Sequence, residues 1–199
     1  MLWGPDDWDA WTVTAPPPAA GQGAIPEVTA LLRDLPGRRT MTVADLGCGR
    51  GALLPFLAAH FLHVVAIDYA PVSLATARGA LRGADVTFRR RDLRDLAPFR
   101  NRFHVAVALD AILGPRWSDV DRILREVHAS LRDGGLLVAT FPGTAPGSGP
   151  LPLAGEPDAE PSFHEVALQF RLRASGFRGI RIKRAGEELL AVAVRRGNN

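Results

Sequence analysis

The sequence predicts an α/β fold: a doubly wound, mainly parallel seven-stranded sheet that ends in a C-terminal antiparallel hairpin. Three observations predict it. Strand-like and helix-like runs alternate from about Ile25 onward, a glycine-rich turn follows the first of these strands, and only four residues, 184–187, separate the last two strands. Four residues are too few for a parallel crossover, so the last two strands are expected to pair as a hairpin.

The strands are expected where short apolar runs end at glycine, proline or charged residues. They are residues 41–46, 64–67, 86–88, 103–109, 136–141, 180–182 and 189–194. The helices are expected over residues 25–35, 52–61 and 71–81, where apolar side chains recur at helical spacing. The alternation indicates a sheet covered by helices on both faces.

Two later helices carry sequence signals for their ends. Ser118 stands three residues before Asp121, and Ser162 three before Glu165, which are the spacings of a capping box. The first of these helices is expected to continue through Leu131 and to stop at Gly134-Gly135. The second is expected over residues 163–174.

Two segments lie outside this alternation. Residues 1–24 form a leader that holds three of the four tryptophans. This leader is either a loosely packed tail whose rings dock on the core or a lid in which Trp8 and Trp11 cover a substrate pocket. Residues 142–161 form a long loop rich in proline and glycine, and loops of this length are usually functional or disordered. The remaining chain, 25–199, is expected to form a single domain.

Composition limits the function classes. No apolar run approaches the ~20 residues that span a bilayer, and Cys48 is the single cysteine, which rules out an intrachain disulfide and cysteine-rich metal sites. The formal net charge of +3 is a poor argument for a nucleic-acid partner. We therefore expect a cytoplasmic monomer or homodimer without a metal, a membrane or a nucleic acid as partner.

The turn after the first strand carries the clearest functional pattern. In Asp45-Leu46-Gly47-Cys48-Gly49-Arg50-Gly51, glycines at alternate positions allow a sharp turn and let a ligand lie directly on the backbone. Gly47-x-Gly49-x-x-Ala52, with Asp68 19 residues after Gly49, also satisfies a loose dinucleotide pattern. Asp45 separates the two cofactor classes. Its carboxylate opposes a pyrophosphate but attracts the ammonium and sulfonium groups of S-adenosylmethionine.

The segment 43–51 resembles the first motif of the class I S-adenosylmethionine-dependent methyltransferases, and the resemblance extends from about residue 25 to the C-terminus. It implies the strand order 3-2-1-4-5-7-6, with S-adenosylmethionine as cofactor and S-adenosylhomocysteine as product. It also implies cofactor contacts along the ends of the first four strands. These residues are Asp45, Gly47, Gly49, Gly51, Asp68 at the ribose, Tyr69 along the adenine, Asp92 and Leu93 at the adenine edge, and Leu109 near the methyl group.

Some of these residues also have a purely structural interpretation. Asp68 could cap the next helix, Asp92 lies in a charged run in which Asp95 is an alternative adenine ligand, and Cys48 is expected to be a small packing residue. A proton acceptor is needed if the substrate offers a hydroxyl or a protonated amine. The candidates are Asp110, at the end of the fourth strand, and His164, which leads the last helix.

The absence of certain motifs favours a small-molecule substrate. The segment 109–113 lacks the Asn/Asp-Pro-Pro-aromatic motif of enzymes that methylate exocyclic amines, and no appended RNA-binding module is present. An RNA or protein substrate stays open as an alternative, because six arginines could form a basic surface. These are Arg89, Arg90, Arg91, Arg94, Arg100 and Arg102. A nicotinamide-dependent oxidoreductase, or a cofactor-binding protein without transfer activity, is the third hypothesis.

Overall fold

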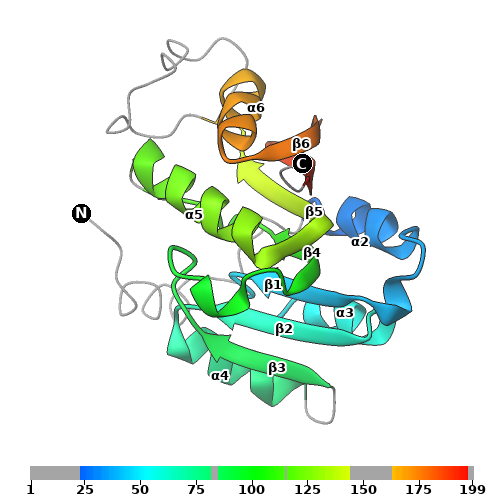
Figure 1. The fold of residues 1–199 in the computed structure, drawn as a ribbon. Helices are drawn as coiled ribbons and strands as arrows, with labels where there is room; N and C mark the ends of the chain where they lie inside the picture. Colours follow the sequence, from blue (N-terminus) through cyan, green and yellow to red (C-terminus); the bar gives the residue numbers. More distant parts are fainter. Residues whose placement is uncertain (1–22, 82–84, 115, 144–162, 197–199) are drawn as a thin grey trace.

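The computed structural model describes residues 23–81, 85–114, 116–143 and 163–196 of the chain. Its centre is a seven-stranded sheet in the order β3-β2-β1-β4-β5-β7-β6, as predicted (Figure 1). The strands are β1 (Thr42–Leu46), β2 (His63–Asp68), β3 (Val86–Arg90), β4 (Phe103–Ala108), β5 (Leu131–Pro142), β6 (Phe177–Ala185) and β7 (Glu188–Arg195).

The first five strands are parallel, and the last two are antiparallel to their neighbours. β7 pairs with β5 and β6 pairs with β7 in antiparallel register, so the predicted C-terminal hairpin is confirmed. Because β1 to β5 run in one direction, their carboxyl ends share one edge of the sheet and their amino ends share the other. These two edges organise the rest of the molecule.

Helices cover both faces of the sheet. They are α2 (Ile25–Arg33), α3 (Leu54–His60), α4 (Pro71–Ala80), α5 (Trp117–Ser130) and α6 (Glu165–Ala174), with short 3₁₀ turns η1 (Arg38–Thr40) and η2 (Ala97–Phe99). In Figure 1, α5 and α6 lie in front of the sheet and α3 and α4 lie behind it. Successive residues of β1 serve the two layers: Val43 packs with α2, α3 and α4, whereas Ala44 packs with α5 and α6.

The expected capping boxes are not present. Helix α5 begins at Trp117 after the extended residue Arg116, so Ser118 lies inside the helix, and no side chain caps it. The fully buried Trp117 ring anchors the start of α5 in the core instead. At α6 the residue before the helix is His164, again without a side-chain cap, and Ser162 lies outside the described residues.

The predicted helix end at Gly134-Gly135 is also wrong. Helix α5 ends at Ser130, and the chain enters β5 directly at Leu131. Leu131 pairs with Phe103, and the register of β4 and β5 shifts between Phe103 and Val105, with Gly134 in the left-handed region at φ +73°. Burial of Leu131 and Phe103 fixes this earlier strand, and the two glycines form an irregularity within it.

None of the helices in the described part of the chain is long and apolar enough to cross a membrane.

Candidate cofactor and active site

The turn after β1 is held against the end of β2. The backbone N–H groups of Gly47 and Cys48 both donate to the carbonyl of Ile67, at 2.7 and 3.0 Å. The N–H of Gly51 donates to the carbonyl of Cys48 at 2.8 Å, which closes the turn before α3. The turn therefore stands at the carboxyl edge of the sheet, where open α/β sheets bind their ligands.

The first two glycines of the turn have different surroundings. A Cβ on Gly47 would lie 2.3 Å from the Cβ of Ala111, so this glycine allows the loop after β4 to pack against the turn. Gly49 has φ +51°, and a Cβ there would meet no atom within 4 Å. Gly49 therefore borders open space, in which a ligand can lie on the backbone.

Asp45 is a buried acid beside this turn, with 4% of its surface exposed. Burial, reinforced by the nearby negative charge of Asp68, raises the pKa of its carboxyl to about 7. Within the described residues it forms no ion pair with a cation and no side-chain hydrogen bond. A buried carboxylate of this kind is stabilised by a ligand that brings a positive charge.

Asp68 ties the turn to the end of β2. Its Oδ2 accepts a hydrogen bond from the N–H of Gly49 at 2.8 Å, and its Oδ1 accepts one from the N–H of Ala70 at 2.9 Å. Ala70 precedes α4, so Asp68 also has the structural role next to a helix start that the sequence allowed. Tyr69 follows it, half-buried, with its carbonyl accepting from Arg90 Nε.

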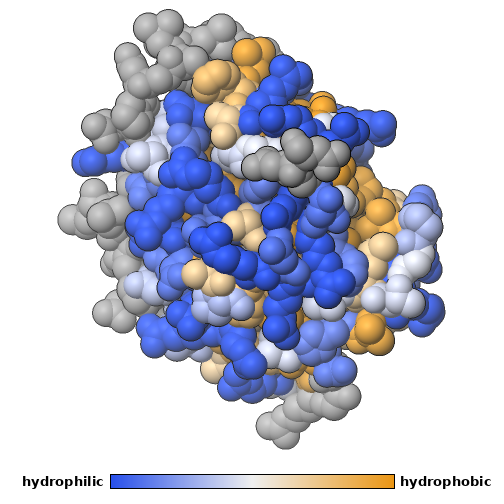
Figure 2. Space-filling model, viewed as in Figure 1, coloured by the Kyte–Doolittle hydropathy of each residue, from blue (hydrophilic) through white to orange (hydrophobic). Residues whose placement is uncertain are grey.

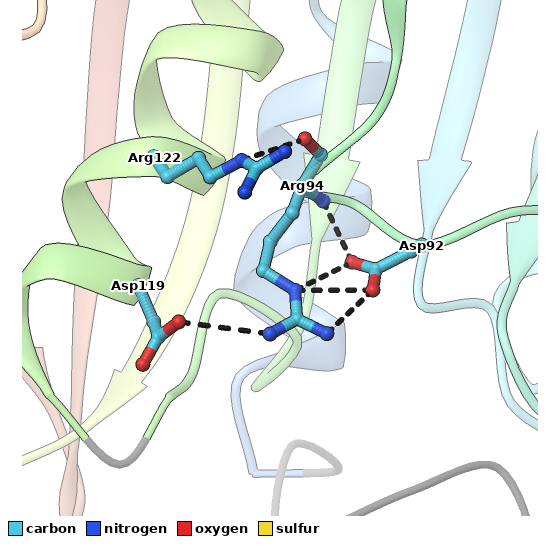
Figure 3. A network of polar contacts seen from close by, with 4 residues as sticks. All are labelled: Asp92, Arg94, Asp119 and Arg122. Atoms are coloured by element: carbon cyan, nitrogen blue, oxygen red, sulfur yellow. Dashed lines mark hydrogen bonds and ion pairs between the residues drawn. The ribbon is translucent and has the colours of Figure 1, made fainter. Parts of the chain in front are cut away.

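Asp92 belongs to a charged network between the β3–β4 segment and α5 (Figure 3). Its carboxylate accepts from the backbone N–H of Arg94 at 2.8 Å and from the Arg94 guanidinium at 2.6 Å. Burial raises the pKa of Asp92, but the hydrogen bonds from Arg94 outweigh burial and lower it overall. Arg94 also lies 3.6 Å from Asp119, and Arg122 donates to the Arg94 carbonyl. Asp92 is therefore held ionised and in one orientation.

Asp110 and its partners form a polar group at the ends of β4, β5 and β7. Asp110 has φ +48°, its N–H donates to Thr140 Oγ1 at 2.9 Å, and the Thr140 hydroxyl donates back to Asp110 Oδ1 at 2.9 Å. Burial raises the pKa of Asp110, while hydrogen bonds with Thr140 and Glu188 oppose the rise. Sequence reasoning missed Thr140 and Glu188. The sequence feature that could have indicated Thr140 is a lone hydroxyl in the apolar run 136–141.

The remaining candidate residues are spread around this edge. Leu93 packs partly buried against the α5 and α6 layer, and Leu109 against the layer of α2 to α4. His164 immediately precedes α6, and its carbonyl accepts from the N–H of Leu168. Trp8 and Trp11 and most of the loop 142–161 lie outside the described residues.

Cys48 is buried in the turn, as expected for a packing residue. Burial and the charges of Asp45 and Asp68 raise the pKa of its thiol, so the thiolate that nucleophilic chemistry needs is disfavoured.

The six arginines do not form one basic surface. Arg89 and Arg90 donate to backbone carbonyls, and Arg91 and Arg94 pair with acids, all near the end of β3. Arg100 and Arg102 instead precede β4, at the opposite edge. Figure 2 shows that hydrophilic residues cover much of the face of the molecule seen in Figure 1.

The comparisons agree with the geometry of this edge. Residues 43–135 match the family model described as a methyltransferase domain. The ubiquinone biosynthesis O-methyltransferase of Hahella chejuensis (strain KCTC 2396) is 43% identical over 65 residues, which cover 32% of this chain and 26% of that protein. The protein of the same name from Methylobacterium sp. (strain 4-46) is 29% identical over 101 residues, which cover 50% and 40%. The chain thus spans less than half the length of these curated relatives.

A solved structure extends the likeness to nearly the whole chain. The Burkholderia thailandensis 1,6-didemethyltoxoflavin-N1-methyltransferase, crystallised with 1,6-didemethyltoxoflavin and S-adenosylhomocysteine, superposes with a TM-score of 0.70 at 24% identity. The match covers 96% of this chain and 83% of that chain. At this identity the likeness demonstrates a common fold.

Proposed function

We propose that this chain is a class I (Rossmann-like) S-adenosylmethionine-dependent methyltransferase that transfers a methyl group to a small-molecule acceptor. The observation that carries the proposal is the buried, unpaired carboxylate of Asp45 beside the glycine turn. A cationic ligand compensates this charge, whereas the pyrophosphate of a nicotinamide dinucleotide would be repelled by it.

The residues of the carboxyl edge fit S-adenosylmethionine. Asp45 offers a carboxylate for its ammonium group, and the open side of Gly49 leaves room for the ligand on the backbone. Asp68, next to Gly49, is suited to accept from the ribose hydroxyls. Tyr69 and the pair Asp92-Leu93 are proposed to contact the adenine, with Asp92 held in place by Arg94.

The cofactor supplies an activated methyl group when it is bound, so the protein need not create an electrophile. The chain has to orient the acceptor, exclude water and, for a hydroxyl or amine acceptor, take up a proton. Asp110 is the proposed proton acceptor, because its backbone packs next to the turn through Ala111 and burial raises its pKa. His164 is the second candidate. It immediately precedes α6.

A small-molecule acceptor is supported by three observations. The end of β4 lacks the Asn/Asp-Pro-Pro-aromatic motif, the six arginines are divided between two edges of the sheet, and the relatives act on small molecules according to their names. We propose that residues 25–199 form one catalytic domain. In the same proposal the leader 1–24, with Trp8 and Trp11, covers the acceptor together with the loop 142–161.

Calorimetric titration with S-adenosylhomocysteine and, separately, NAD tests the cofactor. We expect saturable binding of S-adenosylhomocysteine and none of NAD. Asp68→Ala is expected to weaken the binding of S-adenosylhomocysteine at least tenfold. Asp85→Ala, at an exposed acid of the opposite edge, is expected to leave its affinity unchanged. Binding of NAD alone, or an Asp68→Ala variant with wild-type affinity, would overturn the proposal.

Transfer of a labelled methyl group tests the acceptor. Hydroxylated aromatic compounds and nitrogen heterocycles are offered in one series, and RNA and a protein extract in another. The proposal expects label on at least one small molecule. Label on RNA or protein only would contradict it, as would binding of the cofactor without transfer to any acceptor.

A further inference from the structure

The amino-terminal edge of the sheet carries a polar hollow that the proposed methyl transfer does not use. It has a volume of about 380 Å³, within the range of small-molecule sites. Its lining is Thr42, His63, Pro98, Arg100, Asn101, Arg102 and Arg132. Thr42, His63 and Arg132 lie at the starts of β1, β2 and β5, and Arg102 immediately precedes β4, so four neighbouring parallel strands bring these residues together.

The lining is cationic and contains no acidic side chain. Within the described residues, none of Arg100, Arg102 and Arg132 forms an ion pair with a carboxylate. Asp85 lies 3.7 Å from His63 and is not paired with any of the three arginines. Within the described residues the three guanidinium groups therefore have no carboxylate partner and can bind an anionic ligand.

These arginines are not required to cap the neighbouring helix. The last carbonyls of α5 accept from backbone groups: Asn101 N–H donates to Ala129, and Arg102 N–H donates to Ser130, at 3.0 and 2.8 Å. A further side chain, Arg195, donates to the carbonyls of Ala129 and Leu131. The side chains of Arg100 and Arg102 are left for another role.

Beside the hollow, His104 and Arg132 face each other with two hydrogen-bond donors and no acceptor. The N–H of Thr42 donates to His104 Nδ1 at 3.0 Å, so this nitrogen carries no proton. Burial and the charge of Arg132 lower the pKa of His104, so the ring is neutral and its proton is on Nε2. Arg132 Nη1 lies 3.2 Å from that same Nε2. Two donors thus face each other, and an oxyanion placed beside them would accept from both.

We propose that this hollow binds a phosphate group through Arg100, Arg102 and Arg132. A phosphate brings one to two negative charges to the three guanidinium groups, and its oxygens match their planar, bidentate donors. The His104 Nε2–H and Arg132 then share one phosphate oxygen. The phosphate belongs either to a small metabolite or to a nucleic-acid backbone, and the two sources are distinguished by experiment.

Calorimetric titration of the full chain with inorganic phosphate, at constant ionic strength in chloride, tests the site. We expect saturable binding with a Kd at or below about 1 mM. Arg102→Gln/Arg132→Gln is expected to weaken phosphate at least tenfold, whereas Arg181→Gln, at an exposed arginine of β6, changes it less than twofold. No saturable binding in the wild type, or an equal loss in Arg181→Gln, overturns the proposal.

Two further binding measurements identify where the phosphate comes from and test this proposal independently of the proposed methyl transfer. A phosphate monoester that binds more tightly than a single-stranded oligoribonucleotide indicates a metabolite. If the oligoribonucleotide binds more tightly and its affinity falls steeply with salt concentration, the phosphate belongs to a nucleic-acid backbone. The double variant should keep S-adenosylhomocysteine affinity within twofold, so a failure of the phosphate site leaves the cofactor assignment intact. Far-ultraviolet circular dichroism checks that the double variant is folded.

Discussion

The two edges of the sheet carry different sets of charged groups. The carboxyl edge holds the acids Asp45, Asp68 and Asp110, and the amino edge holds the arginines of the phosphate hollow. Helices that alternate with parallel strands present their positive N-terminal ends at the first edge and their negative C-terminal ends at the second, so each set of side chains complements helix dipoles. That effect is worth about 0.3–1 kcal/mol at the surface, too little to account for a buried acid.

The exposure of the charged side chains differs between the two edges, and it distinguishes a charge held for a ligand from one that only complements a helix dipole. Asp45 is 4% exposed, whereas Arg100, Arg102 and Arg132 are exposed. The protein bears a real desolvation cost at Asp45 and almost none at the arginines. The buried charge at the carboxyl edge is therefore the stronger evidence for a ligand site, and variants at this edge should have the larger effects.

The largest effect is expected from Gly47→Val. Its Cβ would meet the Cβ of Ala111 at 2.3 Å, and φ +71° is strained for a β-branched residue. We expect a loss of about 3–5 kcal/mol in the free energy of unfolding, measured by urea denaturation. Gly49→Ala is the matched control, because its side chain points into open space and costs about 1–2 kcal/mol. Equal losses in the two variants would contradict the close packing of Ala111 against Gly47.

The second effect is a pH dependence of stability that comes from Asp45. Its pKa rises from an ordinary 3.8 to about 7 on folding, so the folded state favours the protonated acid. The free energy of unfolding should therefore fall as pH rises from about 4 to about 7 and should level off above that, by up to about 4 kcal/mol. Denaturation of Asp45→Asn across the same range should lack this component. An unchanged profile in the variant would contradict the assignment.

The third effect concerns Thr140. Thr140→Val removes both hydrogen bonds to Asp110 and should cost about 1–2 kcal/mol in stability. The Thr140 hydroxyl opposes the rise in the pKa of Asp110, so its loss should move the rising limb of kcat/KM to higher pH. Thr140→Ser keeps the hydroxyl and should restore the wild-type profile. A pH profile of Thr140→Val identical to wild type would remove Asp110 as the base.

The smallest effect is expected from Arg94→Gln. Without the guanidinium, Asp92 loses its fixed orientation, and S-adenosylhomocysteine should bind about threefold to tenfold more weakly by calorimetry. Arg91→Gln removes the neighbouring exposed pair with Asp95 and should have no effect. A larger loss in Arg91→Gln would favour Asp95 as the adenine ligand.

The sequence predicted the sheet well because its inner strands are apolar and end at glycines or charged residues. It predicted β6 as 180–182, whereas the strand covers Phe177–Ala185, because the exposed positively charged residues of this edge strand hide the alternation. Helix ends were less predictable. The burial of Trp117 and Leu131, which involves contacts distant in sequence, overrides the local serine and glycine signals of α5.

The residues of the candidate site were also predictable only where they are close together in sequence. The local motif of residues 45–51 could be interpreted directly, because backbone turn and ligand contact come from the same glycines. Thr140 and Glu188 could not be found, since 30 and 78 residues separate them from Asp110 and only the pairing of β4, β5 and β7 brings them near. Arg100 and Arg102 of the amino edge were grouped with the arginines near the end of β3 because they are close in sequence, although the sheet separates them.

The role of Asp45 is tested most directly by the number of protons released when S-adenosylhomocysteine binds. Calorimetry at pH 7 in buffers of different ionisation enthalpy measures it. With a pKa of about 7, Asp45 is half protonated in the free protein, and a bound ammonium group should ionise it, so about 0.5 proton should be released. Asp45→Asn should release none and bind at least tenfold more weakly. Binding without proton release in the wild type, or the same release in the variant, would contradict the role of Asp45.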